Sequence, residues 1–484
     1  MVHRGFGVVT TLLTGGLVSG CATIPRHAGF PEVAKTVEQR TGLHIQQYAG
    51  APTGLVADTI QELLRDELTL DRAVRIAALN NRSLQATLEE LGIARADLIQ
   101  AGLITNPIFS GHARFPDVAG KANVEFAVTE SVLDTLFIPL RRKLAGAQFE
   151  QAKLRVGDAV LSLMAKVKAT YYTAQAAGQI QGMRRSVLQA AEAAAQLAER
   201  QHQAGNISAL DLANQQAFYQ QAQLELMQSE AQAKIARERL NQMLGVSATE
   251  ASWQLAAHLP ELPPTDPSLE GLEATALSQR LDLAAAQKEI EIQRRNVSMA
   301  RFGLLPVSGL GVSTETESGG DRVTGPTWEV AVPVLDWNQA ARARATAQLQ
   351  QSQHRLAALE NDIRSEVRTG HDQLLAARQA TERYRDAIIP LRVRILEETQ
   401  RHYNYMLLGA YDLLLAKQNE IIARREYIEA LRDYWITRSE LERAIGGQLP
   451  AGEPSVLSPQ PTASSMTQEV PTPAHQHQHG GDSP

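Results

Sequence analysis

Helix-forming residues dominate the long stretch from about Leu140 to Gln203, and within it apolar and small residues recur with a seven-residue period. The apolar positions are spaced alternately by four and three residues and shrink toward the far end: Val156, Val160, Leu163, Val167, Thr170, Ala174 and Ala177. This spacing predicts a helix whose apolar seam packs along other helices. A run of about 64 residues at ~1.5 Å each is ~95 Å long, so its neighbours must be long as well.

The same organisation occurs twice, at a shift of about 200 residues. Arg82–Pro107 matches Arg280–Pro306, and Gly205–Leu212 matches Leu408–Leu413. Each half is predicted to contain a helix that ends at a proline, a pair of strands, a long helix, a short glycine turn and a second long helix. An internal repeat of this kind predicts a fold built from two equivalent halves.

Each half carries two short segments in which polar and apolar residues alternate with the period of a strand that has one wet face. The predicted strands are 108–115 with 123–132 in the first half, and 307–316 with 327–335 in the second. The stretches 116–121 and 317–325, rich in Gly and Asp, are predicted as loops. Four strands are too few to close a cylinder, so several chains must contribute strands.

The start of the chain has the build of a secretory signal: a short basic beginning, an apolar run from Phe6 to Val18, and then small residues. Val18-Ser19-Gly20-Cys21 resembles the bacterial lipobox, which predicts that Cys21, the single cysteine, is lipidated and holds the chain to one leaflet. The alternative is an ordinary signal peptide with an incidental cysteine. Ala22, where an Asp would resemble an inner-membrane retention signal, favours the outer membrane.

Composition narrows the classes of function. The formal charge is −6 with a pI near 6.1, and no basic block is present, which argues against a nucleic-acid partner. Aromatic residues make up only 5% against 44% hydrophobic residues, as expected for narrow helix seams. Gly309-Leu310-Gly311 lacks the third glycine of a nucleotide site, and no metalloprotease or serine-hydrolase motif occurs. We therefore expect no enzymatic activity and no cofactor.

Two further groups of residues are candidates for binding. Asp211 and Asp412 lie where a helix's first turn begins, which predicts a capping role, with ion binding as the alternative. Residues 448–484 are rich in Pro, Ser, Thr and Gln and are predicted to be disordered. This tail ends with His475, His477 and His479, which form either a weak metal site or incidental low complexity.

Taken together, these features resemble the TolC family of outer-membrane efflux factors. The resemblance is carried by LTLDRAVRIAALNNRSLQATLEELGIARADLIQAGLITNP at 68–107, by AVPVLDWNQAARARATAQ at 331–348, and by the paired turns. It implies a mainly α fold with a membrane β-barrel portion: a homotrimer whose twelve-stranded barrel, four strands per chain, continues into a long α-helical barrel with a two-fold internal repeat. One departure is that the strand-to-helix junctions differ, Leu133–Pro139 in the first half and Leu335–Asn338 in the second.

The resemblance implies a passive outer-membrane duct of a Gram-negative bacterium that works with a periplasmic adaptor and an inner-membrane pump, with heavy-metal ions such as copper or small toxic compounds as cargo. The alternatives are a coiled-coil envelope lipoprotein and the exit duct of a type I protein-secretion system. Adaptor contact is implied at the two helix turns: Gly205, Asn206, Ile207, Ser208, Leu408, Gly409 and Ala410. Asp386, Glu397 and Glu398 are hypothesised to form acidic rings in the pore; the alternative is a solvated outer face with arginine partners.

These predictions divide the chain into six segments. A signal peptide occupies 1–20, and a lipidated extension that joins an equatorial domain occupies 21–66. The remaining segments are a first repeat, a linker, a second repeat and the His-ending tail, at 67–247, 248–270, 271–447 and 448–484.

Overall fold

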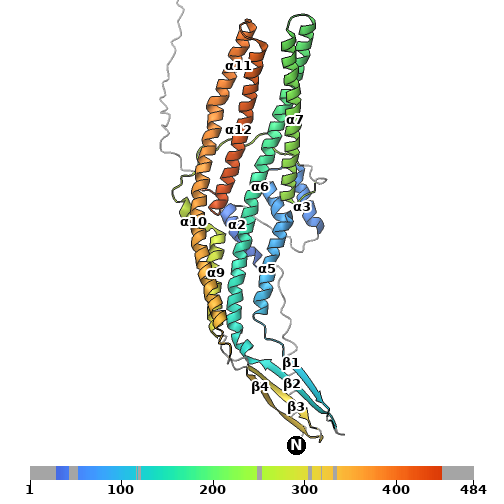
Figure 1. The fold of residues 1–484 in the computed structure, drawn as a ribbon, viewed down its shortest axis with the longest axis vertical. Coiled ribbons are helices and arrows are strands. Elements are labelled where there is room, and N and C mark those ends of the chain that lie inside the picture. The colour runs from blue at the N-terminus through green and yellow to red at the C-terminus, as the bar shows by residue number, and fades with distance from the viewer. Residues whose placement is uncertain are drawn as a thin grey trace, which may run out of the picture.

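The computed structural model describes residues 29–42, 53–115, 117, 121–247, 253–302, 308–317, 319–330 and 335–449. Cys21, the signal segment and the three tail histidines lie outside the described residues. Within the described part, the chain forms a long rod with a sheet at one end and two helix-to-helix turns at the other (Figure 1).

The order of elements is repeated in the two halves of the rod. The first half contains α4 (Leu70–Asn80), α5 (Arg82–Gln100), β1 (Ile108–Arg114), β2 (Asn123–Ser131), α6 (Val132–Gln203) and α7 (Ala209–Leu244). The second contains α8 (Leu272–Gln279), α9 (Leu281–Phe302), β3 (Ser308–Thr316), β4 (Arg322–Val330), α10 (Gln339–Arg383), the π-helical turn η1 (Tyr384–Ile388), α11 (Ile389–Asn404) and α12 (Ala410–Ala444). The predicted two-fold repeat is therefore confirmed. In the part of the chain that the structure describes, α2 (Phe30–Thr41) and α3 (Thr53–Arg65) precede it.

Helix α6 is 72 residues long, or about 108 Å at the usual rise. It begins before Pro139 rather than after it, because Ser131 Oγ accepts a hydrogen bond from Asp134 N–H and caps the helix directly at the end of β2. The predicted seam is buried at Val156, Val160 and Val167. These side chains belong to one core with residues of α2, α4, α7 and the connection that follows α7.

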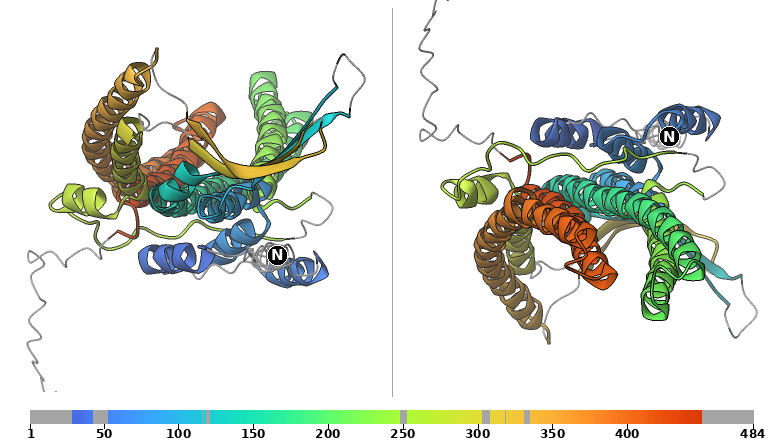
Figure 2. Two further views of the ribbon diagram at one scale, coloured as in Figure 1. Left: turned by 90° about the horizontal axis from the view of Figure 1, so that it is seen from below. Right: turned by 90° about the horizontal axis from the view of Figure 1, so that it is seen from above.

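The helices form an open, curved row rather than a closed bundle, and Figure 2 shows this row along the rod axis. Helices α2 and α3 and the connection between α7 and α8 lie together on one side of the row (Figure 2). Among the described residues, every helix is too short or too polar to cross a membrane.

The second long helix carries one local irregularity, at η1. The N–H of Ile389 bonds to the carbonyl of Tyr384, five residues back, instead of four. Pro390 follows immediately, and a proline inside a helix has no N–H to donate and collides with the preceding turn. The π-helical turn widens the helix at that point, so α10, η1 and α11 continue as one long rod.

The four strands form one antiparallel sheet in the order β1-β2-β3-β4, which leaves β1 and β4 as edges. The predicted position of the fourth strand, 327–335, is wrong. The pairs Thr316–Arg322 and Glu315–Val323 start β4 five residues earlier, within the stretch predicted as a loop. The Gly and Asp residues of 317–325 favoured a loop, but Gly325 and Pro326 pair with Ser313 and Val312 of β3, and the strand continues through them.

The pairing register gives the sheet two chemically different faces. Side chains of directly opposed residues lie on the same face, and they alternate along each strand. One face is mainly apolar over most of its length and carries Phe109, Phe126, Val128, Leu310, Val312, Pro326 and Trp328. The other is mainly polar and carries Ser110, His112, Arg114, Asn123, Glu125, Thr129, Ser313, Glu315, Thr327 and Glu329.

Candidate functional site

The first helix turn, between α6 and α7, is built on a glycine and a capping pair. Gly205 adopts φ +75°, and Asn206 N–H bonds to the carbonyl of Gln201, closing the end of α6. Ser208 caps α7: its Oγ accepts from Asp211 N–H at 3.1 Å, and the Asp211 carboxylate accepts from Ser208 N–H at 3.3 Å. Asp211 thus holds the turn closed by reciprocal hydrogen bonds.

The second turn, between α11 and α12, has the same backbone shape but a different residue at its centre. Met406 adopts φ +60°, at the position that Gly205 occupies in the first turn. Leu407 N–H bonds to the carbonyl of His402, and Asp412 Oδ2 accepts from Gly409 N–H at 3.2 Å. A left-handed conformation costs a residue with a Cβ about 1–2 kcal/mol. Residue 406 is therefore a methionine at a position whose backbone conformation favours glycine.

Large apolar side chains gather on this second turn and point into solvent. Met406 is 93% exposed and Leu407 69% exposed. The same patch includes Tyr405, Leu408 and Tyr411, whereas the exposed apolar side chain on the first turn is that of Leu210. We call Tyr405, Met406, Leu407, Leu408 and Tyr411 the apolar tip. Sequence reasoning named only Leu408 from it, although four successive apolar residues beside a turn glycine were a usable signal.

Of the three acidic candidates for a pore ring, Asp386 lies in η1, and Glu397 and Glu398 are neighbours farther along, in α11. Asp386 pairs with its neighbour Arg385 at 2.7 Å, and this hydrogen bond lowers the pKa of the Asp386 carboxyl. Glu398 pairs with Arg401 at 3.0 Å. Glu397 is exposed. About 16 Å of helix separates Asp386 from the two glutamates, so one chain does not bring the three together.

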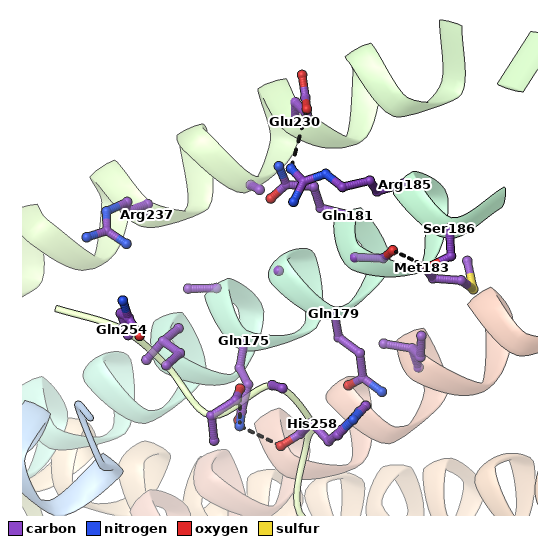
Figure 3. A pocket seen from close by; sticks show the side chains of 18 of the residues that line it. Gln175, Gln179, Gln181, Met183, Arg185, Ser186, Glu230, Arg237, Gln254 and His258 are labelled. Atoms are coloured by element: carbon purple, nitrogen blue, oxygen red, sulfur yellow. Dashed lines mark hydrogen bonds and ion pairs between the residues drawn. The ribbon is translucent and has the colours of Figure 1, made fainter. Parts of the chain in front are cut away.

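A groove of about 1150 Å³ lies between α6, α7, α12 and the connection after α7 (Figure 3). Its floor is open at Gly178 and Gly182, where an added Cβ would meet no atom within 4 Å. Arg237 stacks at 3.8 Å over the Trp253 ring, and Gln175 donates to the carbonyl of His258 at 2.7 Å. These contacts attach the connection to the helices. In the part of the chain that the structure describes, no cluster of His, Cys, Asp or Glu is placed to hold a metal ion.

A residue that sequence reasoning missed, Asp266, joins three separate segments. Its carboxylate is 3% exposed and pairs with Arg378 of α10 at 3.0 Å and with Arg438 of α12 at 2.9 Å. It also accepts a hydrogen bond from the Tyr434 hydroxyl at 2.6 Å. Burial, together with this carboxylate, raises the pKa of Tyr434. Asp266 therefore ties the connection between the two halves to both long helices of the second half.

Changing Asp266 to Asn is expected to lower the free energy of unfolding by about 2 kcal/mol, because two largely buried arginines lose their shared carboxylate. The matched control is Glu382→Gln, which removes the other carboxylate that pairs with Arg378, in a more exposed i,i+4 position; we expect a change below about 0.5 kcal/mol. Thermal unfolding followed by circular dichroism checks both. Equal midpoints for the two variants would contradict the joining role of Asp266.

The comparisons with known proteins agree with this geometry. Residues 139–246 match the family described as outer membrane efflux protein. The chain is 23% identical to the cobalt-zinc-cadmium resistance protein CzcC of Cupriavidus metallidurans over 400 residues, which is 78% of this chain and 90% of the relative. It is 23% identical to the outer membrane protein OprJ of Pseudomonas aeruginosa over 474 residues, covering 89% and 95%.

Among solved structures, the outer membrane channel CmeC of Campylobacter jejuni superposes with a TM-score of 0.69 at 16% identity, covering 80% of this chain and 87% of CmeC. The fold is thus that of the TolC-like outer-membrane channels, as the resemblance implied. The family match covers residues 139–246, and the similarity to CzcC, OprJ and CmeC extends over most of the chain.

Proposed function

We propose that three copies of this chain assemble into a passive duct of the outer membrane, through which a tripartite system exports heavy-metal ions. The observation that carries the proposal is the sheet, which has two free edges, one apolar face and one polar face, and whose strand β2 runs directly into the long helix α6. Exposed strand edges are unstable in lipid. Pairing β1 of one copy with β4 of the next turns three four-stranded sheets into one closed twelve-stranded sheet.

The partners at the other end of the rod follow from the two helix turns. The apolar tip exposes side chains that a soluble surface rarely gathers in one place, which marks it as a contact surface. It lies at the end of the rod farthest from the sheet (Figure 1). We assign it, with the first turn, to docking of the periplasmic adaptor that connects the duct to an inner-membrane pump.

The metal cargo is tested in cells. A strain that lacks this chain is compared with its parent on copper, zinc, cobalt and cadmium salts and on organic toxic compounds. The name of CzcC associates that relative with cobalt, zinc and cadmium. We expect lower tolerance to at least one metal and unchanged tolerance to the organic compounds. Loss of tolerance to the organic compounds alone would overturn the metal assignment and leave the duct in place.

The length of chain before α2 fits a lipid anchor at Cys21. Gly29 packs against Phe149, which is about 26 Å along α6 from its start beside the sheet. The eight residue steps from Cys21 to Gly29 span at most about 27 Å. When fully extended, this stretch would therefore be just long enough to bring an acyl group on Cys21 to the plane at which the helices meet the sheet.

Deleting residues 23–26 is expected to reduce the amount of protein in the outer membrane, because the remaining four steps reach only about 14 Å. Inserting four glycines and serines after residue 24 is the matched control, and it should leave the amount unchanged. Immunoblots of separated membranes, with labelled palmitate as a check of acylation, measure both. An acylated deletion variant present at normal amounts would contradict the anchoring geometry.

A further inference from the structure

Four polar side chains meet across three strands at the end of the sheet that lies away from the helices. Arg114 of β1 approaches Glu125 of β2 at 3.5 Å and Glu315 of β3 at 4.0 Å. Asn123 of β2 donates to Glu315 at 2.5 Å. We call Arg114, Asn123, Glu125 and Glu315 the distal collar.

The strand register places the whole collar on the polar face. Glu125 is directly opposite Glu315, and Arg114 is directly opposite Asn123. Along β2, the collar residues Asn123 and Glu125 are at odd-numbered positions. Phe126 and Val128 are at even-numbered positions and therefore lie on the opposite, apolar face. If the apolar face meets lipid, as in the proposed duct, the collar lines the lumen near its outer opening.

The collar is not electrically neutral. It contains two carboxylates and one guanidinium, so each copy contributes a charge of −1 with Asn123 uncharged. The ion-pair distances of 3.5 and 4.0 Å are long, and the Arg114 side chain is largely exposed, so Arg114 compensates the carboxylates only in part. Three copies around one lumen would form a ring with a net negative charge.

We propose that the distal collar sets a preference for cations at the outer end of the duct, and that Glu125 and Glu315 are its specificity-determining residues. The inference rests on the proposed trimeric duct. A ring of fixed negative charge raises the local concentration of cations and lowers that of anions. The structural alternative is a cross-strand network that only holds β1, β2 and β3 in register. The two interpretations differ in what happens when charge is removed without loss of hydrogen bonding.

The test is the potassium-to-chloride permeability ratio of the purified full-length protein in a planar bilayer under a salt gradient. We expect the double variant Glu125→Gln/Glu315→Gln to lower the ratio about twofold, and Arg114→Gln to raise it, when the dilute side bathes the outer end. Screening extends over about 30 Å at 0.01 M salt but only about 10 Å at 0.1 M. Reversing the gradient should therefore weaken the effect of both variants.

The control is Asp58→Asn on α3, which removes an exposed acidic side chain from a helix that lies away from the sheet and should leave the ratio unchanged. If all variants conduct with the same permeability ratio, the proposed role of the distal collar in ion selectivity is contradicted, whereas the proposed duct is not. The absence of conductance in every variant, wild type included, would overturn both. A ratio that falls in the glutamine variant and rises in the Arg114 variant supports the proposal.

Discussion

Replacing Val128 by Arg is expected to abolish accumulation of the assembled protein in the outer membrane, whereas the same change at the neighbouring Ala127 is expected to be tolerated. Val128 lies well inside β2, on the apolar face, between Phe109 and Val312 of the adjoining strands. An arginine on the lipid side of a membrane sheet costs about 2–4 kcal/mol near the midplane. Three copies would each bear that cost in the same assembly.

Ala127 is a closely matched control, because it is one residue away and faces the opposite side. Its direct neighbours are Ser110 and Ser313, on the polar face. Both variants gain the same charge and a side chain of the same size. Immunoblots of the outer-membrane fraction, run with and without heating, report the amount of assembled protein. Equal amounts of the two variants would mean that the faces of the sheet have been assigned incorrectly.

The second large effect concerns the apolar tip. The double variant Met406→Gly/Leu407→Ser is expected to lose most of the tolerance that the system confers, with no loss of folding stability. Glycine adopts the left-handed conformation of residue 406 without the cost of about 1 kcal/mol or more that a Cβ imposes. Leu407 is 69% exposed and contributes little to the core. The change therefore removes contact surface while the turn keeps its shape.

A matched control removes exposed apolar surface elsewhere. Ile93→Ser on α5 takes away a side chain that is 64% exposed, far from the turns. It should leave tolerance near the wild-type level. Thermal unfolding and growth on the metal salt are measured for both variants. A tip variant that folds normally and confers full tolerance would show that the apolar tip is not part of the docking surface.

Much of the architecture could be predicted from periodicity. The seam of Val156, Val160 and Val167 predicted the long helix and its buried face, because a seven-residue period leaves few other structures. The internal repeat located both turns, the first strand pair and the third strand. The fourth strand was misplaced because the Gly- and Asp-rich stretch 317–325 is typical of a loop, and only the pairing with β3 shows that the strand begins at Arg322.

The contacts that join distant segments could not be predicted in this way. Asp266 lies 112 positions from Arg378 and 172 from Arg438, and no local pattern connects residues so far apart in sequence. The left-handed Met406 was also hidden, because methionine is an unusual choice for that backbone shape. Conversely, the turn at Gly205 could be predicted from the sequence, because glycine adopts a positive φ without steric cost and Gly205 has such a φ.

Native mass spectrometry of the detergent-solubilised protein measures directly whether three copies close one sheet. We expect a single species with three times the mass of the mature, acylated chain, which falls to the mass of one chain when the detergent no longer preserves the assembly. A protein that remains a single copy under conditions that keep its sheet folded would contradict the closed sheet and, with it, the duct.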